Sequence, residues 1–230
     1  MNSKPFLHTH PYEPFLFPEA TKLIVGTLPP PRFTTGELKH DDVDFCYGSR
    51  NGMLWPILNE IFGLDLKYET TTEAANQRKG FLIAQKIGVC DIVASAERQK
   101  VDASDLGMLN VKLRDLVGYL QEYPNIQTVL FMGGNSKNGP EYFFRRQLKE
   151  RGLKLDLVNN EVPRIHKLDL PFTSNGVEKF RTITAVSLTA PSGAANRAVG
   201  SLQTYKDLKT ANPNFNTFDF RVMQYRKFFE

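Results

Sequence analysis

Two loops rich in small residues and proline each follow a short apolar run. The first loop, Gly26-Thr27-Leu28-Pro29-Pro30-Pro31, follows Leu23-Ile24-Val25. The second loop, Ser-Leu-Thr-Ala-Pro-Ser-Gly-Ala-Ala-Asn-Arg at 187–197, follows Ile183-Thr184-Ala185-Val186. Apolar runs of this length are typical of buried parallel strands. Because ligands of open α/β sheets bind beyond the carboxyl ends of the strands, we expect the two loops to face each other across one crevice.

A third segment combines aromatic side chains with an amide. Phe45-Cys46-Tyr47-Gly48-Ser49-Arg50-Asn51-Gly52 is followed closely by Trp55. A pocket for a planar base needs a flat face for stacking and a polar group that reads the base edge. Phe45 or Tyr47 could stack, and the Asn51 amide can both donate and accept. In the alternative interpretation, Phe45, Tyr47 and Trp55 belong to the core and Asn51 caps a helix.

Several other residues each allow more than one role. Gly133-Gly134 could bind phosphate at a helix N-terminus or simply turn the chain, and it matches neither the Walker nor the dinucleotide pattern. Asp91 could act as a base or hold a loop, and Arg197 is a candidate phosphate ligand. The four histidines lack metal-ligand spacing. We expect the remaining basic clusters to be solvated helix faces; they contain Arg145, Arg146, Lys149, Arg151, Arg221, Arg226 and Lys227.

The composition is that of a globular protein large enough for a full core. The 230 residues are 41% hydrophobic and 23% charged. A net charge of +4 and a pI of about 9.0 permit a polyanionic partner without requiring one. Cys46 and Cys90 provide no disulfide framework, which favours a reducing compartment. Since we find neither a signal-peptide pattern nor an apolar run of membrane-spanning length, we expect a cytoplasmic protein without a membrane partner.

Alternating strands and helices predict a single α/β domain. We expect three α/β/α layers around a central, mostly parallel, four-stranded sheet. Strands are predicted at 22–27, 128–132, 153–158 and 181–188, with a short extended segment at 88–93. Helices are predicted at 53–62, 72–87, 104–120 and 139–151. Residues 32–50 are expected to form a loop over the site, and residues 159–180 a long irregular connection.

Taken in order, these segments resemble the motifs of the uracil-DNA glycosylase superfamily, with the mismatch-specific and hypoxanthine-DNA glycosylases as the most similar members. The resemblance covers roughly residues 20–205, which leaves 1–20 as an N-terminal extension and 206–230 as a C-terminal helical extension. The segments that carry it are Gly26–Pro29, Tyr47–Asn51 with Trp55, Gly88–Val93 with Arg98 and Asp102, Val129–Gly133 followed by Phe143-Phe144, and Ala190–Ala194.

The resemblance implies removal of a deaminated base such as uracil or hypoxanthine from DNA by hydrolysis of its N-glycosidic bond. It assigns catalytic roles to Asn51 and to the backbone amides of Thr27 and Leu28. The base would contact Gly26, Pro29, Phe45, Tyr47 and Ser192. DNA would contact Arg50, Pro191, Gly193, Asn196 and Arg197. It further implies a monomer that needs no cofactor or metal and prefers single-stranded or mismatched DNA.

Two departures from the family pattern leave other interpretations open. Some members carry an asparagine in the first loop, near Leu28, and a histidine in the second loop, where Leu188 or Ala190 stands here. The alternatives are an inactive DNA-binding relative of the same fold, a nucleotide-binding α/β protein that uses Gly133-Gly134, and an interaction protein without enzymatic activity.

Overall fold

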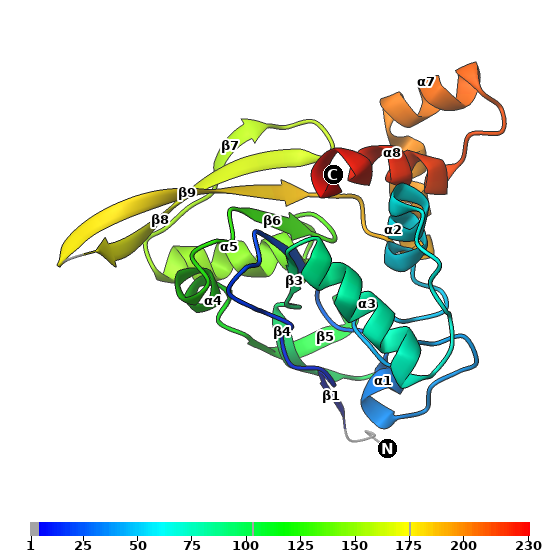
Figure 1. Ribbon diagram of the computed structural model, residues 1–230, viewed down its shortest axis with the longest axis horizontal. Coiled ribbons are helices and arrows are strands. Elements are labelled where there is room, and N and C mark those ends of the chain that lie inside the picture. The colour runs from blue at the N-terminus through cyan, green and yellow to red at the C-terminus, as the bar shows by residue number, and fades with distance from the viewer. Residues whose placement is uncertain (1–4, 103, 175) are drawn as a thin grey trace.

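A computed structural model describes residues 5–102, 104–174 and 176–230, and in it a mixed sheet of six strands runs through the molecule (Figure 1). The strand order is β3-β2-β6-β9-β8-β7. β3, β2, β6 and β9 are parallel, whereas β8 and β7 continue the sheet antiparallel. The strands are β2 (Lys22–Val25), β3 (Ile87–Val89), β6 (Thr128–Phe131), β7 (Asp156–Asn159), β8 (Arg164–Ser174) and β9 (Val177–Ser187). The prediction of one α/β domain is correct, but the sheet is larger than the four strands expected.

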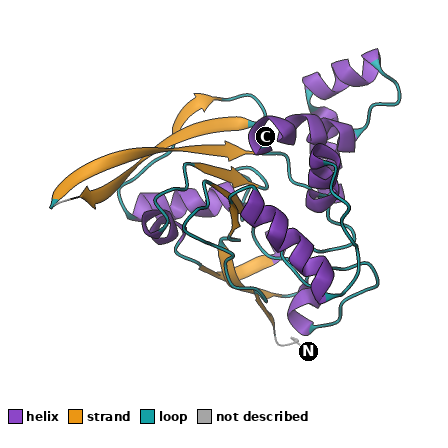
Figure 2. Ribbon diagram, in the orientation of Figure 1, coloured by secondary structure: helices purple, strands orange, loops and turns teal. Residues whose placement is uncertain are grey.

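Helices cover both faces of the sheet, as Figure 2 shows. One face packs against α4 (Leu116–Glu122) and α5 (Pro140–Glu150). The opposite face packs against α2 (Leu54–Phe62), α3 (Thr72–Ala84) and α8 (Thr217–Phe229). This double cover explains why the parallel strands are apolar throughout rather than alternating.

The predicted helix at 104–120 is wrong over its first half. The structure has a short 3-10 turn, Asp105–Gly107, followed by strand β5 (Met108–Leu113), and only α4 is helical. β5 belongs to a separate three-stranded sheet of order β1-β4-β5, with β1 at Phe6–Thr9 and β4 at Val93–Arg98. Leucines at 106, 109 and 113 fit helical spacing, but Leu106 and Leu109 are exposed. Pairing with β4 therefore overrides the local pattern.

The predicted irregular connection at 159–180 is also wrong. Much of it belongs to β8 and β9, which pair antiparallel from Arg164↔Ser187 to Ser174↔Val177. The two strands form a long ribbon that extends away from the helices in Figure 1. In β8, Leu168 and Leu170 alternate with Lys167 and Asp169 and are buried on the core side. This period-two pattern is typical of a strand with one buried face.

Short helices complete the fold. α1 (Pro31–Thr35) overlaps the start of the predicted loop at 32–50, which is therefore partly helical. α6 (Asn196–Ser201) begins at the end of the second loop, and α7 (Gln203–Ala211) and α8 follow it. α8 begins with a capping box between Asn216 and Asp219. In the described part of the chain, no helix has the length and apolar character to cross a membrane.

Candidate functional site

A pocket of about 490 Å³ lies at the carboxyl ends of the parallel strands, and residues of both the first and the second loop line it. Segments after β2, β3, β6 and β9 all reach it, together with the segment at 47–54. The residues lining the pocket are Gly26, Thr27, Leu28, Pro29, Pro30, Arg32, Tyr47, Gly48, Ser49, Asn51, Gly52, Leu54, Asp91, Asp105, Met132, Ala190, Pro191, Ser192, Gly193 and Ala194. The predicted crevice between the two loops is therefore present.

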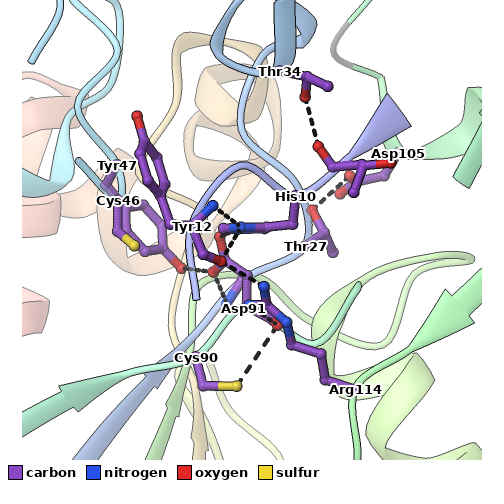
Figure 3. Close-up of polar contacts among 12 residues, drawn as sticks. His10, Tyr12, Thr27, Thr34, Cys46, Tyr47, Cys90, Asp91, Asp105 and Arg114 are labelled. Atoms are coloured by element: carbon purple, nitrogen blue, oxygen red, sulfur yellow. Dashed lines mark hydrogen bonds and ion pairs between the residues drawn. The ribbon is translucent and has the colours of Figure 1, made fainter. Parts of the chain in front are cut away.

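A buried aspartate ties three segments together at this pocket (Figure 3). Asp91 Oδ1 accepts hydrogen bonds from the Gly26 backbone N–H and the Tyr47 hydroxyl, each at 2.8 Å. Asp91 Oδ2 lies 2.9 Å from His10 Nε2. Both carboxylate oxygens are thus occupied, so Asp91 holds the first loop and the Tyr47 ring in place. Of the two roles that the sequence left open for Asp91, a base or a residue that holds a loop, this geometry fits the second. Nothing in the sequence indicated His10 as its partner.

Tyr47 and Gly26 adopt a geometry that few other residues would tolerate. Tyr47 has a φ of +59°, in the left-handed region that non-glycine residues seldom occupy. A Cβ at Gly26 would lie 2.3 Å from the Tyr47 hydroxyl and 2.8 Å from Asp91 Oδ1. Burial strongly raises the pKa of Tyr47, with the nearby Asp91 charge adding to it, so the phenol stays protonated and donates to Asp91. Glycine is therefore required where the first loop passes the aromatic ring.

A second carboxyl group, Asp105, also lines the pocket. Its Oδ1 accepts a 2.8 Å hydrogen bond from the Thr27 hydroxyl. Burial raises the pKa of Asp105 to about 6, and the negative charge of Asp91 contributes to this rise. The hydrogen bond from Thr27 and the positive charge of Arg98 lower the same pKa but do not outweigh burial. A helix at 104–120 would not bring this residue to the first loop, and no spacing within the sequence links residue 105 to residue 27.

An arginine lies at the pocket wall and is fixed by a buried aspartate. Arg32 Nε and Nη2 donate to the two Asp42 oxygens at 2.6 and 2.7 Å, and Nη2 also donates to Ser49 Oγ at 2.9 Å. Although burial opposes ionisation, hydrogen bonds from Arg32 and from the Arg50 and Lys39 amides lower the pKa of Asp42 to about 2. Both groups are therefore ionised, and Asp42 compensates the Arg32 charge while it fixes the guanidinium beside the pocket. Nothing in the sequence indicated this pair.

The second loop is held by α8. Arg221 is fully buried and donates to the Ala190 and Ser192 carbonyls and to Asn196 Oδ1 at 2.9–3.0 Å. The loop also contacts the segment at 47–53 through a bridge between Gly52 and Ser192 and a 2.9 Å bond from Met53 N–H to the Pro191 carbonyl. The expectation that Arg221 lies on a solvated face is wrong.

The structure places the predicted site residues in three groups. Gly26, Thr27, Leu28, Pro29, Tyr47, Asn51, Pro191, Ser192 and Gly193 line the pocket. Phe45 is buried with Trp55, at a ring separation of 6.3 Å, so the core interpretation is correct for that residue. Asn196 is engaged by Arg221, whereas Arg50 and Arg197 are exposed outside the pocket lining.

Asn51 lies at an exposed position of the pocket lining. The N-cap of α2 is Met53, without a side-chain cap, so Asn51 does not cap that helix. Its backbone N–H donates to Ser49 Oγ at 3.3 Å, and within the described chain its side-chain amide makes no hydrogen bond. The amide is therefore available to a molecule in the pocket.

Gly133-Gly134 does not form the tight strand-to-helix turn that a phosphate site needs. α5 begins at Pro140 with Gly139 as its N-cap, several residues beyond the glycine pair. This separation weakens the nucleotide-binding alternative. Across residues 5–102, 104–174 and 176–230, no three histidine, cysteine or acidic side chains gather in an arrangement that could hold a metal ion.

Fold and site together define an α/β protein with a ligand pocket at the carboxyl ends of its parallel strands. Comparisons with protein-family models, curated proteins and solved structures found no match.

Proposed function

We propose that the protein is a DNA glycosylase that hydrolyses the N-glycosidic bond of a deaminated base. The observation that carries the proposal is the pocket between the first and second loops, with the Asn51 amide on its lining. These are the loops and the amide that the resemblance to uracil-DNA glycosylases assigns to base binding and catalysis. A flipped nucleotide is the substrate that suits a pocket closed by both loops.

The size and lining of the pocket support a base as ligand. A volume of about 490 Å³ falls within the roughly 300–1,000 Å³ typical of small-molecule pockets. Leu28, Leu54 and Met132 supply apolar surface, and the Tyr47 ring supplies an aromatic group. Asn51 adds a donor and an acceptor that could read the polar edge of the base.

The first loop offers donors for the departing base. The backbone N–H groups of Thr27 and Leu28 donate to no residue in the described part of the chain. When the glycosidic bond breaks, the sugar develops positive charge and the base leaves as an anion. One preorganised donor to such an anion is typically worth about 3 kcal/mol, roughly a hundredfold or more in rate. Asn51 would orient the water or the base during this step.

Three arginines are the proposed contacts to the DNA backbone. Arg50 and Arg197 are exposed outside the pocket lining, and Arg32 is held at the pocket wall by Asp42. Phosphate contacts of this kind position the strand without reading its sequence. Residues 193–197 of the second loop would occupy the space that the flipped base leaves.

A panel of oligonucleotides tests the proposal. Duplex and single-stranded DNAs that each carry one lesion, uracil, hypoxanthine or xanthine, are incubated with the protein and then with alkali, which cleaves abasic sites. We expect cleavage of at least one lesion-containing strand and none of the undamaged strand. Absence of cleavage for every lesion, in a protein that binds the same DNA, would instead support an inactive relative, an alternative that the apolar Leu28 of the first loop favours.

A further inference from the structure

Two carboxyl groups line the pocket, and their hydrogen bonding differs. Asp91 has both oxygens engaged, by Gly26, Tyr47 and His10. Asp105 receives a side-chain hydrogen bond from Thr27 on Oδ1 only, and its Oδ2 bonds to no residue of the described chain. Asp105 is half-buried and lines the pocket. A carboxylate with one fixed and one accessible oxygen can orient a water molecule.

We infer that Asp105 is the general base that takes the proton from the attacking water in this pocket. The inference rests on the proposed glycosylase function and adds a catalytic residue to it. The first loop carries Leu28 where other family members place a water-positioning amide, so the water needs another acceptor. Asp105 supplies one next to the same loop, joined to it through the Thr27 hydroxyl.

The step balances without a further reactant. Water donates one proton to Asp105 Oδ2, and its oxygen forms a bond to C1′ of the flipped nucleotide. The bond between C1′ and the base nitrogen breaks, and its electron pair leaves with the base. The products are an abasic sugar with a hydroxyl on C1′, a base anion and a protonated Asp105. The base anion or solvent then takes the proton from Asp105 and restores the carboxylate.

The surroundings of Asp105 fix its position and its proton affinity. Its backbone carbonyl accepts a 2.9 Å hydrogen bond from Asn138 Nδ2, which anchors the 3-10 turn. The charged groups that face the carboxyl are Arg98 from β4, whose guanidinium also approaches Asp102 to 3.7 Å, and Asp91 from the loop after β3. With burial as the largest cause, the pKa of Asp105 is raised to about 6. A base with this pKa is ionised at neutral pH and still binds a proton well.

The test is the pH profile of single-turnover cleavage, measured on the lesion that the wild-type protein cleaves. For the wild type we expect the rate to rise with pH through about 6 and then level off, because only the ionised Asp105 accepts a proton. Asp105→Asn should lose on the order of 10²- to 10⁴-fold and lose this inflection. Asp65→Asn is the matched control: it makes the same change at an exposed carboxylate outside the pocket lining and should leave rate and inflection unchanged.

Thr27→Val provides a second test, which can be carried out even if the Asp105→Asn protein does not fold. The substitution keeps the backbone amide and removes the hydroxyl that lowers the pKa of Asp105. The inflection should therefore move to higher pH. An Asp105→Asn protein that retains both rate and inflection, or a Thr27→Val inflection that does not move, would overturn the assignment and leave the glycosylase proposal standing. A wild-type protein that cleaves no lesion would refute both.

Discussion

Replacing Gly26 by alanine perturbs the contact between the first loop and the aromatic ring of Tyr47. The new Cβ would lie 2.3 Å from the Tyr47 hydroxyl, whereas ordinary contacts begin at 3.4 Å. The hydroxyl must therefore move by about 1 Å, away from a ring position that its 2.8 Å bond to Asp91 defines. Asp91 Oδ1, 2.8 Å from the same Cβ, must move as well.

The cost follows from the hydrogen bond that is lost. A bond to a charged group is worth about 1.5–3 kcal/mol, which for a protein of this size lowers the unfolding temperature by roughly 3–12 °C. Displacement of catalytic groups by about 1 Å can reduce a rate about a hundredfold. We expect both effects in Gly26→Ala, the first by thermal unfolding and the second by single-turnover cleavage.

Tyr47→Phe provides the control. It removes the hydroxyl, and with it the closest clash, so Gly26→Ala should cost less stability in the Tyr47→Phe protein than in the wild type. This is a double-mutant cycle with a nonzero coupling energy. Equal costs in the two backgrounds, or an unchanged unfolding temperature in Gly26→Ala, would refute the argument that the ring excludes a side chain at this position.

Four further predictions concern the site. Asn51→Ala should lose at least tenfold in cleavage with an unchanged unfolding temperature; unchanged activity would remove Asn51 from the site. Arg221→Met leaves loop carbonyls without donors and should lower the unfolding temperature by roughly 6–12 °C, whereas an unchanged value would contradict the role of α8. Log affinity for duplex DNA should fall with log salt at about 0.9 per phosphate contact, with roughly three to five contacts, and a flat dependence would count against DNA as partner. Cleavage should be faster in single-stranded or mismatched DNA than in a paired duplex, because flipping the base costs less there and the exposed Gly193 has no side chain to fill the space that a flipped base leaves in a duplex. Equal rates would argue against this.

The parallel part of the fold could be predicted because its strands are buried on both faces. Runs such as Leu23-Ile24-Val25 and Val129-Leu130-Phe131 are apolar without interruption, and the loops after them carry glycine or proline. The predicted strand at 181–188 covers the second part of β9, but β8 and the first part of β9 lie in the predicted irregular connection. Leu168 and Leu170 alternate there with polar residues, and an Asn-Gly pair at 175–176 is typical of hairpins. The error at β5 has a different cause, since the partner strand that decides its conformation is nonlocal.

The residues of the candidate site also divide into those that could be predicted from the sequence and those that could not. Loop residues such as Pro29 and Ser192 could be placed together because strand order brings the carboxyl ends of parallel strands to one edge. Side-chain pairs that join distant segments could not be predicted from spacing. Asp105 meets Thr27, and His10 meets Asp91, only through the tertiary arrangement. Burial of a charge, as at Arg221, likewise depends on which acceptors the folded chain provides.

The dependence of the second loop on α8 also has a consequence for the order in which the protein assembles during synthesis. Residues 217–229 leave the ribosome after all strands of the parallel sheet, so the sheet can form while Arg221 is not yet accessible to the loop. Until then, the Ala190 and Ser192 carbonyls lack the donor that orients them. A nascent chain stalled before residue 217 would carry the sheet and the first loop but not a completed pocket.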